Sequence, residues 1–158
     1  MAITEDLTKL GQSARRLRDG ADELGQVIAE IDRTLGELHI GFEYLHPRPL
    51  LEKTVVSGEG KRVIEVAYLG YLPFRSEHHL VVKTVKILES KAAMSPENSG
   101  SMTPLLLAPR SIRHAAVDVL PEMVRAITRQ LDELADGVER RRDVAREVLG
   151  ELQRRQQG

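Results

Sequence analysis

The sequence contains no cysteine and no tryptophan among its 158 residues. Without cysteine the chain cannot form disulfides, thiolate nucleophiles, zinc fingers or iron–sulfur ligands. It also has no apolar run long enough to span a membrane, and Met1–Glu5 lacks the charged-then-apolar order of a signal peptide. We therefore expect a soluble, cytoplasmic protein without a membrane segment.

The chain has almost no net charge: 23 Lys and Arg balance 24 Asp and Glu, which gives a formal charge of −1. Binding to nucleic acid or to a membrane surface requires a clear excess of cations, so we expect neither partner. The main basic cluster consists of Arg140–Arg142, Arg146, Arg154 and Arg155, but acidic residues interleave with it at Glu139, Asp143, Glu147 and Glu151. This pattern is typical of a solvated helix face with ion pairs between successive turns.

Aromatic residues and prolines are scarce and lie almost entirely in the middle of the chain. The three tyrosines and two phenylalanines all lie between Phe42 and Phe74, and only Pro121 follows Pro109. Helix-forming residues dominate both flanks, whereas proline and glycine interrupt regular structure. The composition therefore predicts three parts: a helix over 1–39, a β-sheet lobe over 40–110 and a helix over 111–158.

Both flanks carry apolar residues at alternating steps of three and four, the spacing of a coiled-coil seam. In the first flank the seam residues are Leu7, Leu10, Ala14, Leu17, Ala21, Leu24, Ile28, Ile31, Leu35 and Leu38. In the second they are Val117, Leu120, Val124, Ile127, Leu131, Leu134, Val138, Arg141, Ala145, Val148 and Leu152, with Arg141 the only polar one. We expect the two helices to pair antiparallel in a hairpin with Leu7 opposite Val148, although a slip of one heptad also matches.

Further apolar and small residues lie beside these seams, outside the contact between two helices. Val27, Met123, Val144 and Leu149 are the largest of them and are our candidates for an oligomer interface. A widened apolar stripe is typical of a bundle of more than two helices. We therefore expect a homodimer with a four-helix bundle, in which the sheet lobes lie either together or at opposite ends.

The centre of the chain has the features of an antiparallel sheet. Runs rich in β-branched residues over 50–57 and 61–69 flank the turn Gly58–Gly60, 79–88 predicts a third strand, and 41–45 predicts a short fourth. The segment 89–103 is polar and aperiodic, which predicts a mobile loop. The fold class is therefore α+β: two long antiparallel coiled-coil helices bracketing a small antiparallel β-sheet lobe. Within the second helix, Pro121 predicts a kink.

Motifs that would indicate catalysis or ligand binding are missing from the sequence. Adjacent His78 and His79 should point to opposite faces of a strand, which is poor geometry for sharing a metal. Gly58–Lys61 resembles a phosphate-binding loop only in part, because it leads into a strand and lacks the second Gly-Lys-Ser/Thr element. No serine lies in a Gly-x-Ser-x-Gly turn. We expect no enzymatic activity, no catalytic residue, no metal and no cofactor.

Tyr68–Arg75 is the strongest candidate for a functional segment. Tyr68, Tyr71, Phe74 and Arg75 bring three aromatic rings and one arginine together near a turn, and these residue types are enriched in binding hot spots. The same rings could instead form the core of the sheet lobe, and the sequence leaves both interpretations open.

Two coiled-coil helices that bracket a β insertion resemble the layout of prefoldin subunits. This resemblance implies a chaperone whose β hairpins assemble an oligomer and whose coils hold client proteins. From the residues themselves we expect instead a non-enzymatic assembly or adaptor protein, which associates with itself through its helices and binds an unidentified protein partner through its sheet. A small enzyme or ligand-binding lobe built on the β centre is the remaining alternative.

Overall fold

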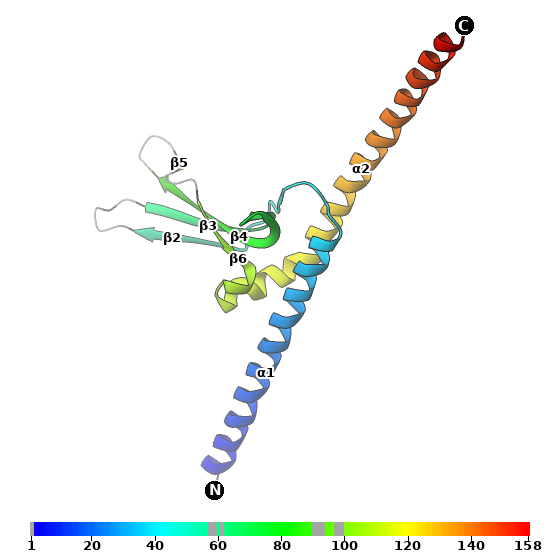
Figure 1. Ribbon diagram of the computed structural model, residues 1–158. Helices are drawn as coiled ribbons and strands as arrows, with labels where there is room; N and C mark the ends of the chain where they lie inside the picture. Colours follow the sequence, from blue (N-terminus) through cyan, green and yellow to red (C-terminus); the bar gives the residue numbers. More distant parts are fainter. Residues whose placement is uncertain (1, 57–59, 61, 90–93, 97–99) are drawn as a thin grey trace. The chain divides into compact units, whose positions relative to one another are not determined.

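The computed structural model describes residues 2–56, 60, 62–89, 94–96 and 100–158. It confirms an α+β fold in which an N-terminal and a C-terminal helix flank an antiparallel sheet (Figure 1). The chain divides into two units, Met1–Ala116 and Val117–Gly158. The first contains α1 (Ala2–Glu37), the whole sheet and the start of α2 (Arg110–Gln157), and the second is the rest of α2.

Two long strands form the centre of the sheet. β3 (Arg62–Phe74) and β4 (Glu77–Glu89) pair along their whole length through a two-residue turn at Arg75 and Ser76. β1 (Tyr44–Leu45) and β2 (Leu51–Val56) pair with β3, while β5 (Met94–Pro96) and β6 (Ser101–Pro104) pair with β4. The short 3₁₀ helix η1 (Leu105–Leu107) then leads into α2.

The strands expected over 50–57, 61–69 and 79–88 are therefore present as β2, β3 and β4, and the one expected over 41–45 is reduced to β1. β3 continues past the expected end, through Pro73, to Phe74. Proline is tolerated where no ladder bond is required, and β1 begins opposite Tyr71, so among the described residues no strand pairs with Pro73 on that side.

Part of the segment 89–103, for which we expected a mobile loop, is instead paired. β5 and the first residues of β6 lie within it and extend the sheet along β4. The sequence did not predict this pairing, because backbone pairing with the free edge of a long strand does not require an alternating apolar pattern. The rest of the segment and most of the turn Gly58–Gly60 lie outside the described residues, but the antiparallel pairing of β2 with β3 is confirmed.

The buried core of residues 1–116 joins the sheet to both helices. α1 contacts β4 and η1, and its one fully buried residue is Ile28. Leu69 and Val81 in the central strands have no exposed surface, and Leu105 in η1 is 1% exposed. The α2 helix begins directly after Pro109, buries Ile112 and Ala116, and continues without interruption through Pro121. The pairing of the two helices as a hairpin stays a prediction.

Candidate functional site

A cleft of about 640 Å³ lies between the C-terminal part of α1, the segment that follows it and the turn end of the β3–β4 hairpin. The seams of the helices and the hairpin tip are the other two features with functional potential. The polar residues that line the cleft are Asp32, Arg33, Glu37, His39, Tyr71, Glu77, His78 and His79.

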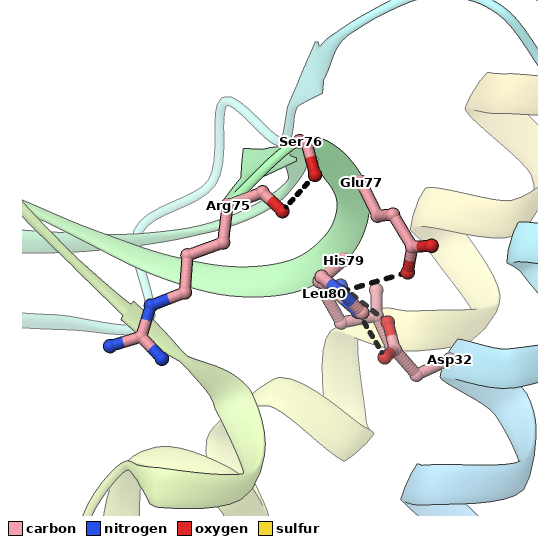
Figure 2. Close-up of polar contacts among 6 residues, drawn as sticks. All are labelled: Asp32, Arg75, Ser76, Glu77, His79 and Leu80. Atoms are coloured by element: carbon pink, nitrogen blue, oxygen red, sulfur yellow. Dashed lines mark hydrogen bonds and ion pairs between the residues drawn. The ribbon is translucent and has the colours of Figure 1, made fainter.

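Asp32 of α1 connects the helix to β4 (Figure 2). One carboxylate oxygen accepts a hydrogen bond from the Leu80 backbone N–H at 2.6 Å, and the other lies 2.8 Å from Nδ1 of His79. On this side of β4, β6 pairs only as far as Val81, so Leu80 is the first residue beyond it. Asp32 therefore satisfies a buried N–H at the strand edge that would otherwise have no partner.

The two adjacent histidines both line the cleft but have different partners. The His78 ring stacks on Tyr71 with 5.5 Å between ring centres. His79 pairs with Asp32, and its Nε2 lies 3.9 Å from a Glu77 carboxylate oxygen. Among the described residues, no group of three or more histidine, aspartate or glutamate side chains could hold a metal ion.

Tyr71 is the buried member of the cleft lining, with 2% of its surface exposed. Burial raises the pKa of its phenol above the ordinary value of 10.0, and the negative charge of Asp32 raises it further. Both causes act against the ionised form. The folded protein therefore holds the Tyr71 proton more tightly than the unfolded chain does.

This linkage predicts a loss of stability in alkaline solution. Below pH 10 the phenol is protonated in both states, and as the pH rises further the unfolded chain ionises first, so the free energy of unfolding decreases. We expect Tyr71→Phe to weaken this alkaline decrease, as measured by urea unfolding at a series of pH values. An identical alkaline decrease in the two proteins would show that Tyr71 is not its source.

The tip of the β3–β4 hairpin presents an arginine stacked on an aromatic ring. The Arg75 guanidinium lies 5.3 Å from the centre of the Phe74 ring, and Figure 2 shows Arg75 directed away from the pair of Asp32 and His79. Arg75 and Ser76 have φ angles of 52° and 73°, in the left-handed region that non-glycine residues seldom adopt. Two consecutive residues in this region form the mirror-type turn that matches the twist of a two-residue hairpin.

The predicted contact residues differ in how far they are buried. Tyr71 belongs to the core, Tyr68 and Phe74 are half-buried, and Arg75 is exposed. Of the predicted interface residues, Val27 on α1 and Val144 and Leu149 on α2 are exposed, whereas Met123 on α2 is buried, with 1% of its surface exposed. Sequence reasoning missed Asp32, because its contact with β4 joins residues 47 and 48 positions apart and nothing in the local pattern marks it.

The seam of α1 is divided into two halves with different surroundings. From Ala21 to Leu35 its residues are buried or half-buried, in the part of the helix that contacts the rest of its unit. Leu7, Leu10 and Leu17 are instead 60%, 64% and 53% exposed, and Ile3 continues the stripe toward the N-terminus. In the unit 117–158, taken by itself, the seam residues Leu134, Val138, Val148 and Leu152 are also exposed.

In the described part of the chain, no helix is both long enough and apolar enough to span a membrane. Comparison of the sequence with protein-family models and with curated proteins, and of the structure with solved structures, gave no match.

Proposed function

We propose that this protein is a non-enzymatic assembly protein, which associates with itself through the heptad seams of its helices and offers its sheet lobe to a protein partner. The observation that carries the proposal is the exposure of the seams at Leu7, Leu10 and Leu17 and at Leu134 to Leu152. Contiguous apolar stripes of this kind are characteristic of surfaces that another helix covers.

The free energy gained by burying the exposed seam side chains supports their contact with a partner. Fully burying a leucine or valine contributes about 1.5–3 kcal/mol, so the seam side chains, which are 50–64% exposed, each have roughly 1 kcal/mol left to gain. Four such side chains on each helix would contribute roughly 8 kcal/mol, against an association cost of about 4–15 kcal/mol. One pair of stripes is therefore marginal, whereas two pairs in one assembly would be sufficient.

The hairpin tip is the part of the sheet lobe that we assign to the partner. An exposed arginine beside an aromatic ring is a combination that protein interfaces favour. An acidic or aromatic protein surface would complement Arg75 and Phe74.

The cleft beside Asp32 favours the ligand-binding alternative less strongly. It is open, and its best-placed polar groups already pair with one another: both Asp32 oxygens are used by Leu80 and His79, and Arg33 pairs with Glu37 at 2.9 Å. Groups that satisfy each other in this way hold α1 on the sheet, and they leave few free hydrogen-bonding positions for a ligand.

The seams can be tested by introducing charge into the exposed half of α1. We expect light scattering to give the wild type at least twice the mass of one chain, 17.7 kDa, and Leu10→Glu with Leu17→Glu to weaken the association at least a hundredfold. Burying a carboxylate without a partner costs free energy, and two such carboxylates in one seam cost more than a hundredfold loss of affinity represents.

A matched control adds the same charge on the outer face of the same helix, at Gln12→Glu and Gln26→Glu, where both residues are exposed. We expect this variant to associate like the wild type, with unchanged helical circular dichroism in both variants. A wild-type mass of a single chain at micromolar concentration would contradict the proposal.

A further inference from the structure

We infer that the exposed seam of α1 pairs antiparallel with the exposed seam of α2 from a second copy of this chain, and that two copies exchange these helices reciprocally about a two-fold axis. The inference rests on the self-association proposed above. It goes further in naming which surface covers which, in what direction and in what register.

The two exposed stripes match in length and in heptad position. Antiparallel coiled coils place the first seam position of one helix opposite the second seam position of the other, and one register does so from end to end. Its pairs along the exposed stripe are Ile3 with Leu152, Leu7 with Val148, Leu10 with Ala145, Ala14 with Arg141 and Leu17 with Val138.

The one polar seam residue has a suitable place in this register. Arg141 lies opposite Ala14, whose small side chain leaves room for the arginine stem while the guanidinium reaches water. A slip of one heptad in either direction leaves exposed leucines or valines at one end without a partner. Arg15 comes near Arg140 on the outer face, where water and salt screen their repulsion.

The start of α2 favours a second copy over the chain's own α2 as the partner in this register. Within the unit 1–116, Arg113 and His114 line a small gap together with Ala21, Leu24, Gly25 and Ile28, so α2 begins beside the middle of α1. Val148 follows His114 by a helical length of about 51 Å, whereas Leu7 precedes Leu24 by only about 26 Å. An α2 that ran back along its own α1 would carry Val148 roughly 25 Å beyond Leu7.

The small free energy gained from one pair of stripes favours a dimer with two-fold symmetry. A single pair of stripes barely offsets the cost of association, and reciprocal exchange provides two identical pairs in one closed dimer. Two-fold interfaces are the commonest form of closed self-association, because each copy contributes the same surfaces to its partner.

Cysteine cross-linking in this cysteine-free chain tests the inference directly. Leu10→Cys is made in one chain and Ala145→Cys in a second chain of different tag length, and the two are mixed, allowed to exchange subunits and oxidised. We expect the mixed disulfide to be the main product, because the two residues are opposite each other only across the dimer. Each variant alone should give few cross-links.

Two further variants make every outcome decisive. Leu10→Cys mixed with Val138→Cys, the partner in the slipped register, should cross-link much less. A chain carrying both Leu10→Cys and Ala145→Cys should form dimers, and an intrachain disulfide at high dilution would overturn the exchange. Efficient cross-linking of Leu10→Cys alone would overturn the pairing of α1 with α2. A monomeric wild type would instead refute the proposed self-association, while a dimer without the mixed disulfide would refute only this inference.

Discussion

Leu69→Ala is expected to lower the free energy of unfolding by about 2–5 kcal/mol, the largest effect on stability that we predict. Leu69 has no exposed surface and pairs with Val82 across the two central strands. Removing its branched end leaves a cavity in a region where strands and helices are already fixed by other contacts. Urea unfolding followed by circular dichroism measures the change.

Val56→Ala provides the matched control for this experiment. Val56 also lies on a strand of the sheet, but it is 64% exposed, so its truncation should change stability by no more than about 0.5 kcal/mol. A similar small loss for Leu69→Ala would contradict the assignment of this part of β3 to the core. It would return the segment Tyr68–Arg75 to the alternative in which all of it is a contact surface.

Asp32→Ala is expected to cost about 2–4 kcal/mol, although the residue lies at the edge of a surface cleft. The substitution removes a hydrogen bond between a carboxylate and the Leu80 N–H, and leaves that N–H without a partner beside a side chain that is 2% exposed. Asp32→Asn keeps an acceptor oxygen for Leu80 but loses the charge, so we expect an intermediate loss.

Glu37→Ala serves as the control on the same helix. Its partner Arg33 is 2.9 Å away, but both side chains are more than half exposed, so the loss should stay below about 0.5 kcal/mol. His79→Ala should fall between this control and Asp32→Ala, because the bond to Leu80 survives. If Asp32→Ala were as mild as Glu37→Ala, the role of Asp32 in holding α1 to β4 would be wrong.

The order of elements could be predicted from the sequence because each depends on local pattern. Heptad spacing and the scarcity of proline predict α1 and α2, and β-branched runs on either side of short turns predict β2, β3 and β4. β5 and β6 could not be predicted, since they are strands only through their pairing with β4. The core position of Tyr71 could not be predicted either, because it depends on β3 continuing to Phe74.

The candidate site depends on tertiary structure to a greater degree. Asp32 and His79 are 47 residues apart, and in the sequence Asp32 is one more acidic residue on an amphipathic helix. Their meeting depends on where α1 crosses the edge of β4 and on where β6 ends. Contacts between distant segments depend on which edges and faces remain free after the local elements form, and periodicity does not encode that choice.

The seam of α1 shows the same division most clearly. Its sequence determined a continuous heptad stripe from Leu7 to Leu38, because helical periodicity is a property of spacing alone. Only the tertiary structure decided that Ala21 to Leu35 is largely occupied within the unit 1–116 while Leu7, Leu10 and Leu17 are left exposed. Identical spacing serves both halves, so the difference arises from the sheet and the start of α2, which cover one half of the stripe and end before the other.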